Sequence, residues 1–157
     1  FFEGKPVGSI PIVNHVLFAE LRQFCEKAFT QLKCHDGAYH MEVFLTRDNQ
    51  EIVFLEIGAR TGGALITRVY ERIFDINIEQ VHYMIQMGLM KQVKTSKKDI
   101  YAGFLNFPKI AGIVSGIETP KVEIEHEFVG FVKPDDMLKK ASNLLEISCS
   151  LIFWDTS

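Results

Sequence analysis

Two acidic residues, Glu42 and Glu56, lie in apolar, strand-like runs on either side of a short polar loop. The runs span residues 38–46 and 51–57 and are rich in Val, Ile, Phe and Leu. This composition is typical of an antiparallel β-hairpin. If the hairpin turns about Asn49, residues whose numbers sum to 98 face each other. Glu42 then lies opposite Glu56 on one face, with β-carbons about 5 Å apart.

Directly opposed carboxylates repel each other and cost stability unless a cation lies between them. A divalent metal resolves the repulsion, and hard oxygen ligands suit Mg²⁺, with Mn²⁺ as a second candidate. Mg²⁺ takes one or two protein carboxylates and completes its shell with water and nucleotide phosphates. The pair therefore indicates a metal–nucleotide site. The alternative is a register shifted by one residue, which would separate the acids onto opposite faces.

A cation and two glycines follow the second strand, in the segment Arg60-Thr-Gly-Gly-Ala. Arg60 offers a fixed positive charge at the strand's end. Gly62 and Gly63 open a helix, whose N-terminal amide groups attract anions. The simpler interpretation of the two glycines is an ordinary turn.

The elements expected to position these residues are helices on both sides of the hairpin. Apolar residues recur three or four apart over residues 14–32, which predicts an amphipathic helix capped by Asn14. A second helical run covers residues 64–87, and Asp75-Ile76-Asn77 divides it into two helices, the second capped by Asn77. Residues 88–99 carry Lys91, Lys94, Lys97 and Lys98 and read as an exposed loop, with an anion-binding patch as the alternative.

Beyond Ile100 the chain changes to short strand-like runs broken by Gly and Pro. They cover residues 101–108, 112–118, 122–129 and 151–154, typical of a small β-rich subdomain. We therefore predict an α+β fold with three parts: residues 1–90 form an antiparallel sheet with helices, 91–99 a basic connection, and 100–157 the β-rich subdomain.

Composition excludes several classes of function. The 157 residues are 47% apolar and carry a net charge of −3, which argues against a strongly basic nucleic-acid binder. No apolar run reaches the roughly 20 residues that span a bilayer, so no membrane role is expected. Three scattered cysteines without metal-ligand spacing fit a reducing compartment, and the cytoplasm is the expected location. The chain begins Phe-Phe-Glu without an initiator Met, as a piece of a longer protein would.

The hairpin segment resembles a known enzyme superfamily. Gly37-Ala-Tyr-His-Met-Glu-Val-Phe-Leu followed by Ile52-Val-Phe-Leu-Glu-Ile-Gly-Ala-Arg-Thr-Gly-Gly63 is similar to the metal-binding half of ATP-grasp ligases, in the carboxylate–amine ligase branch. The likeness is good over about residues 14–88 and loose elsewhere. It implies an enzyme that activates a small carboxylate with ATP as an acyl phosphate, which an amine or similar nucleophile then attacks.

The resemblance also implies a role for each candidate residue. Glu42 and Glu56 would hold the Mg²⁺ (or Mn²⁺) that bridges the ATP phosphates. Arg60 would be the catalytic residue, contacting the acyl phosphate or the substrate carboxylate. The backbones of Gly62 and Gly63 would border the same anion. His40 lies near this face, with either a packing role or a direct one.

Two departures from the family pattern matter. Many members carry Asn two residues after the second Glu as a further metal ligand, where this chain has Gly58. The lobe that supplies a lysine and a glycine-rich loop to ATP has no counterpart in the sequence. We therefore expect the missing N-terminal lobes of the same polypeptide as partners, and little activity from the chain by itself.

The main alternative is a non-catalytic binding module that retains the ATP-grasp half-fold. Gly58 favours it, whereas the retained acids and Arg60 oppose it. A metal-dependent hydrolase of another fold is disfavoured, because no further His or Asp clusters with the acids. The sequence names neither the carboxylate nor the nucleophile, and a homo-oligomer is compatible with it.

Overall fold

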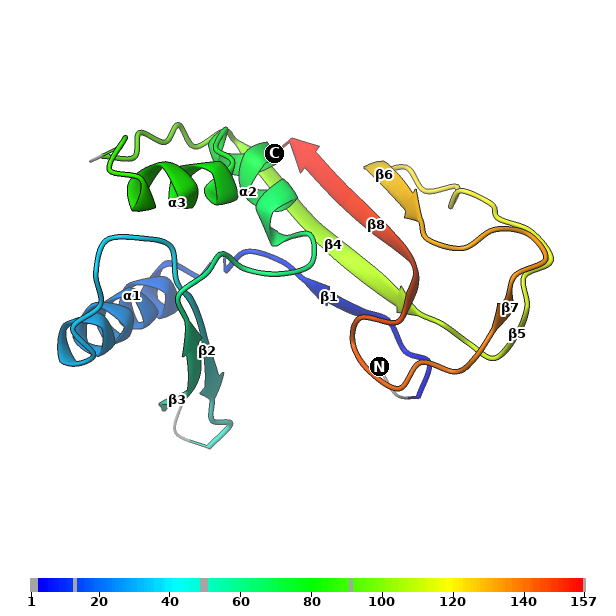
Figure 1. The fold of residues 1–157 in the computed structure, drawn as a ribbon, viewed down its shortest axis with the longest axis horizontal. Helices are drawn as coiled ribbons and strands as arrows, with labels where there is room; N and C mark the ends of the chain where they lie inside the picture. Colours follow the sequence, from blue (N-terminus) through cyan, green and yellow to red (C-terminus); the bar gives the residue numbers. More distant parts are fainter. Residues whose placement is uncertain (1–2, 13, 49–50, 91, 157) are drawn as a thin grey trace. The chain divides into compact units, whose positions relative to one another are not determined.

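The computed structural model describes residues 3–12, 14–48, 51–90 and 92–156. The chain divides into two compact units (Figure 1). One comprises residues 12–97, and the other comprises residues 1–11 together with 98–157. Helices and antiparallel sheets make up the fold, which confirms the predicted α+β class. None of the helices in the described residues is long and apolar enough to cross a membrane.

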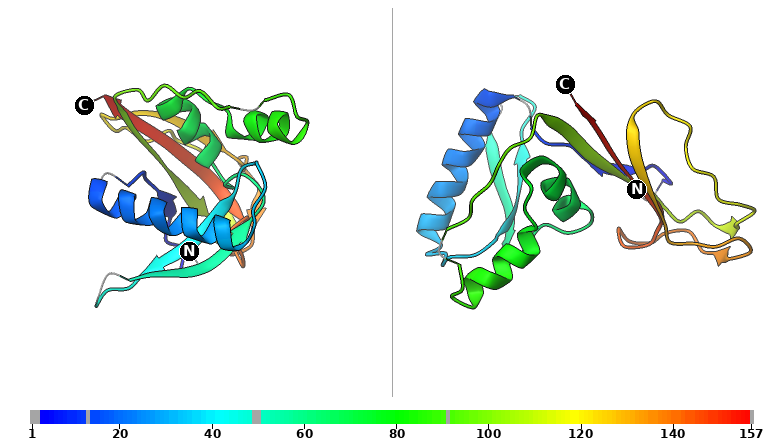
Figure 2. Two further views of the ribbon diagram at one scale, coloured as in Figure 1. Left: turned by 90° about the vertical axis from the view of Figure 1, so that its left-hand side faces the viewer. Right: turned by 90° about the horizontal axis from the view of Figure 1, so that it is seen from above.

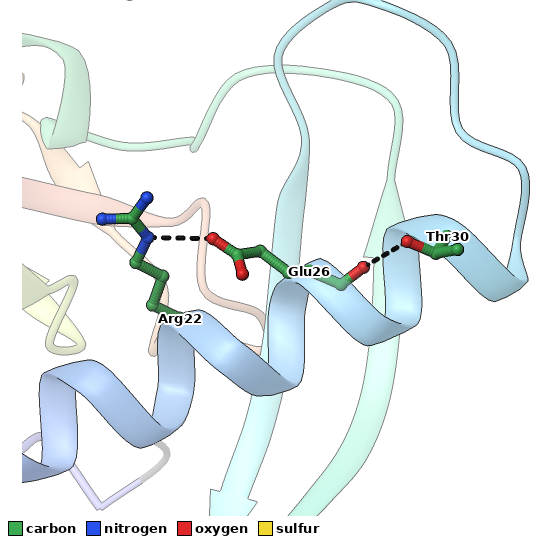
Figure 3. A network of polar contacts seen from close by, with 3 residues as sticks. All are labelled: Arg22, Glu26 and Thr30. Carbon is green, nitrogen blue, oxygen red and sulfur yellow. Dashed lines mark hydrogen bonds and ion pairs between the residues drawn. The ribbon is translucent and has the colours of Figure 1, made fainter.

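The first unit begins with helix α1 (His15–Gln31). Asn14 caps it as predicted, because its Oδ1 accepts hydrogen bonds from the amides of Val16 and Leu17 at 3.0 and 3.1 Å. The half-buried residues of α1 form the predicted stripe, namely Leu17, Leu21, Phe24, Cys25, Ala28 and Phe29. The opposite face carries an exposed ion pair between Arg22 and Glu26, and the hydroxyl of Thr30 donates to the carbonyl of Glu26 (Figure 3). Such surface pairs contribute little stability.

Strands β2 (His40–Leu45) and β3 (Ile52–Gly58) form the predicted hairpin. The predicted turn at Asn49 lies outside the described residues. The ring of Phe29 on α1 contacts the ring of Tyr39, with centroids 5.3 Å apart. Tyr39 shares its face with Met41 and Val43, which are half-buried, so α1 covers that face of the hairpin (Figure 2). Glu42 and Phe44 point to the other, exposed face.

The predicted helical run over residues 64–87 forms two helices, α2 (Ile66–Phe74) and α3 (Ile78–Gln86). They are separated at the predicted residues 75–77. Asp75 ends α2 in the left-handed conformation, with φ of 57°. Asn77 caps α3, accepting from the amide of Gln80 at 2.9 Å. The described residues of the basic segment 88–97 are mostly exposed, as expected for a loop. Lys91 lies outside the described residues.

Helix α3 holds the segment that leads into β2. The amide of Ala38 donates to Nδ1 of His82, and Nε2 of Gln86 donates to the carbonyl of Asp36, both at 2.9 Å. Gly37 lies between these two contacts. A β-carbon there would approach Gln86 Nε2 to 2.9 Å and the His82 ring to 3.4 Å, so a larger residue would displace the Gln86 side chain from its contact with Asp36. The helix thereby sets where β2 begins.

The second unit is a four-stranded antiparallel sheet in the order β1–β4–β8–β6. Its strands are β1 (Val7–Ser9), β4 (Ile100–Pro108), β8 (Ile147–Thr156) and β6 (Glu125–Gly130). The central pair β4–β8 supplies the core of this unit, with Phe104 5% and Ile152 1% exposed. Ser150 and Asn106 face each other across the two strands and share a buried hydrogen bond of 2.7 Å.

Two details of this unit differ from prediction. Only Gly112–Ile113 of the run 112–118 is a strand, β5, and it pairs with the equally short β7 (Met137–Leu138). Glycines at 112 and 116 weaken that run, since they give a strand no side chains to pack. Residues 1–11 group with the β-rich unit because β1 pairs with β4. The division of the structure therefore differs from the predicted boundary of residues 1–90 at the N-terminal end.

The contact between α3 and β2 generates a stability prediction. We expect His82→Ala to lower the free energy of unfolding by about 1 kcal/mol or more, because the partly buried Ala38 amide loses its acceptor. Gln80→Ala is the matched control, since Gln80 is exposed on the same helix and its side chain is not the cap. Urea unfolding of both variants measures the difference. Equal stability of the two would contradict the assigned role.

Candidate functional site

The two predicted acids lie directly opposite each other. Glu42 and Glu56 are register partners in the β2–β3 hairpin, so their β-carbons project from the same face. The alternative, a register that separates them onto opposite faces, does not occur at these positions. The structure therefore brings the predicted pair together.

A β-bulge next to the acids produces this register. On the turn side the pairs are Leu45↔Ile52, Phe44↔Val53 and Val43↔Phe54, whereas Glu42 already pairs with Glu56. A regular continuation would have placed Glu42 opposite Leu55. The extra residue in β3, Leu55, shifts the pairing by one and puts both acids on one face. Bulges commonly reorient side chains in this way beside functional sites.

The bulge also determines which apolar side chains border the acids. Alternation along an unbroken β3 places Phe54 on the face of Glu56. Because Phe54 pairs with Val43 instead, it belongs to the opposite face, and Val53 joins Phe44 on the side of the acids. The reason is the single extra residue, which periodicity in the sequence does not reveal.

No lysine or arginine pairs with either acid in the part of the chain that the structure describes. Both acids are exposed, and within the described residues no lysine or arginine lies within 4.0 Å of either carboxylate. Nε2 of His40 lies 3.1 Å from Oε1 of Glu42. Two like charges are thus held on adjacent strands, and this arrangement favours a bound cation.

The donor set fits a hard divalent ion that keeps other ligands. Carboxylate oxygens are what Mg²⁺ and Mn²⁺ prefer, and Mg²⁺ is commonly held by only one or two of them plus phosphate and water. No three His, Cys, Asp or Glu side chains in the described part of the chain converge to hold a metal alone. The residues therefore fit a shared metal–phosphate site and not a closed protein cage.

Arg60 lies just beyond β3 with its side chain folded back. Its amide donates to the carbonyl of Gly58, and its guanidinium donates to the carbonyl of Thr61, both at 2.9 Å. A β-carbon built on Gly58 would be 3.3 Å from Cγ and Nε of Arg60. The arginine stem thus fills the space where a longer residue at position 58 would place its side chain. Arg60 is exposed, so the remaining guanidinium donors face solvent.

The two glycines connect Arg60 to the start of α2. A β-carbon on Gly62 would come within 2.9 Å of the Ile66 side chain, while one on Gly63 would be 4.0 Å from Nη1 of Arg60. Ala64 has φ of 53°, an uncommon left-handed conformation for a residue with a β-carbon. Leu65 precedes α2 and gives it no side-chain cap, while the amide of Ile66 donates to the carbonyl of Gly63 at 3.3 Å. The arrangement favours an anion beside Arg60.

The cysteines are not part of the candidate site. Cys25, Cys34 and Cys149 are unpaired. Burial raises the pKa of both the Cys25 and the Cys149 thiols above their ordinary value, so these two stay protonated at neutral pH.

The contact between Gly58 and Arg60 makes a testable prediction. Gly58→Ala should displace the Arg60 side chain, because the neighbouring atoms must move by a few tenths of an ångström, while the hairpin is kept. Gly63→Ala is the control, since its β-carbon meets only Nη1 at 4.0 Å. The NMR signal of the Arg60 Nε–H group should shift in the first variant only. Similar shifts in both would contradict the packing described above.

Comparison with solved structures identifies proteins of similar fold, whereas comparison by sequence finds none. Neither protein-family models nor curated protein sequences match the chain. Among the solved structures that match, two do so at 17% identity and a TM-score of 0.75, each over 40% of its own length. Phosphoribosylglycinamide synthetase from Anaerococcus prevotii matches 96% of the chain, and L-amino acid ligase from Bacillus licheniformis matches all of it.

Both neighbours are ATP-grasp carboxylate–amine ligases. At this identity the likeness shows the fold, and the chain spans less than half the length of either enzyme. The resemblance seen in the hairpin motif is therefore confirmed at the level of structure: this chain has the fold of a part of the ATP-grasp ligases.

Proposed function

We propose that this chain is the metal-binding part of an ATP-dependent ligase that joins a carboxylate to an amine. The observation that carries the proposal is the Glu42–Glu56 pair, held on one face of the hairpin without a cation among the described residues. Glu42 and Glu56 would hold Mg²⁺ or Mn²⁺ against the phosphates of ATP. A metal there would neutralise charge on the phosphoryl oxygens during transfer.

Arg60 could supply a second positive charge, besides the metal, in such a reaction. A carboxylate oxygen of the substrate attacks the γ-phosphorus of ATP and ADP leaves, which yields an acyl phosphate. The amine nitrogen then attacks the acyl carbon, phosphate departs and the nitrogen loses a proton. A guanidinium aimed at oxygens that gain charge stabilises both steps, and no side-chain nucleophile is needed. The Thr61 carbonyl would orient Arg60 for this role.

Gly62 and Gly63 would let the anion approach the backbone closely. The uncapped start of α2 adds the positive end of the helix dipole near the same place. The charges needed for phosphoryl transfer would then come from the metal, the guanidinium and the helix. Small-molecule carboxylates and amines are the substrates that this chemistry requires, and the rest of the nucleotide cleft would come from other parts of the polypeptide.

A non-catalytic module with the same half-fold is the second candidate. Gly58 favours it, because a glycine supplies no further metal ligand. In this structure the aliphatic part of the Arg60 side chain occupies the space beside Gly58. Position 58 therefore offers no metal ligand, but its small size leaves room for Arg60. The two candidates differ in one observable, which is ATP-dependent release of ADP and phosphate in the presence of a carboxylate and an amine.

The metal assignment makes the first prediction for this function. Glu56→Gln should weaken Mn²⁺ binding to the chain by more than about tenfold, since losing even a group that only supports a ligand typically costs 10- to 100-fold. Paramagnetic broadening of amide signals by Mn²⁺ measures the affinity and shows where the ion binds. Glu20→Gln on the exposed face of α1 is the control and should change nothing. Broadening that survives Glu56→Gln would overturn the assignment.

The role of Arg60 makes a second prediction. In the protein encoded by the whole gene, Arg60→Ala should lower carboxylate-dependent ADP formation by about 10²- to 10³-fold, the usual cost of losing an oxyanion donor. ATP affinity should change much less, because the acids hold the metal–nucleotide. Steady-state rates and equilibrium ATP binding separate the two effects. Equal loss of both, or no loss of either, would argue against Arg60 as the catalytic residue.

A further inference from the structure

We propose that His40 is a positioning residue that holds the carboxylate of Glu42 in the orientation needed to bind metal. This inference rests on the proposed function, because it concerns the same acid pair. It assigns a role to a residue that pattern alone left between packing and direct participation.

The contact itself defines the geometry. Nε2 of His40 lies 3.1 Å from Oε1 of Glu42. A carboxylate oxygen can only accept, so the imidazole must carry its proton on Nε2. The bond occupies one oxygen of Glu42 and leaves Oε2 for another partner. A carboxylate tethered at one oxygen has fewer orientations to lose when the other oxygen binds an ion.

The surroundings explain why the ring points along the strand. His40 pairs with Gly58 across the hairpin, but the stem of Arg60 covers Gly58. The imidazole instead leans toward Glu42, two residues along on the same face. Its side chain is 23% exposed, against 45% for Glu42, so the less exposed group can act as a fixed support for the more exposed one.

The geometry distinguishes this role from that of a direct ligand. His40, Glu42 and Glu56 do not form a three-residue metal cluster in the part of the chain that the structure describes. The ring forms its printed polar contact with an acid, as expected for a group that supports a ligand from outside the metal shell. Imidazole is also a poor match for Mg²⁺, which prefers oxygen.

Two substitutions test the inference on the full chain, with Mn²⁺ as the probe. His40→Leu removes the donor and should weaken Mn²⁺ binding by about tenfold or more. His40→Gln can still donate from its amide and should bind within a few-fold of the original chain. The measurement is run in the same buffer for every variant. His126→Leu is the control, because His126 contacts the carbonyl of Ile124 and should not affect the metal.

The outcomes distinguish a wrong role for His40 from a wrong metal site. If His40→Leu binds Mn²⁺ as well as the original chain while Glu56→Gln does not, the positioning role is wrong and the proposed function stands. If His40→Gln is as weak as His40→Leu, with amide spectra that show an intact fold, the hydrogen-bond role is overturned. If the original chain shows no Mn²⁺ broadening near Glu42 and Glu56, the proposed function itself fails.

Discussion

Electrostatic repulsion between Glu42 and Glu56 is the constraint on which the rest of the site depends. The hairpin holds two carboxylates opposite each other on an exposed face. A stable sheet does not require such a pair, and like charges in directly opposed positions destabilise it. Arg60, which could have neutralised them, instead donates to the Thr61 carbonyl at the end of the strand.

The scaffold that maintains this arrangement is local to residues 12–97. Helix α1 covers the opposite face of the hairpin through contacts such as Phe29 with Tyr39. Helix α3 anchors the chain just before β2 through His82 and Gln86. The bulge at Leu55 then sets which residues share a face. Each contact is modest in energy, but together they determine where the carboxylates project.

The sequence predicts much of this unit because its signals are local. Asn14 and Asn77 cap helices through bonds to amides two or three residues away, so residue type and position suffice. The expected centre at Asn49 pairs Glu42 with Glu56, but next to the turn the strands pair one residue off that register, and the bulge restores the pairing of the acids. The bulge does not follow from the sequence, because Phe54 and Leu55 are both apolar and either can face α1. The pairing of β1 with β4 could not be predicted either, since it joins residues about 100 positions apart. Strand β1 is short and exposed, so its residues show no alternation of apolar and polar side chains. The position of the Arg60 side chain beside Gly58 depends on its rotamer, which the spacing of residues in the sequence does not determine.

The most direct test of the central claim is anomalous diffraction from crystals of the chain grown with Mn²⁺ and ATP. We expect an anomalous peak between strands β2 and β3, with oxygens of both Glu42 and Glu56 about 2.1 Å from the ion. Phosphate oxygens of the nucleotide should complete the shell on the exposed side. A peak coordinated elsewhere, or ordered nucleotide with neither carboxylate near its metal, would contradict the account.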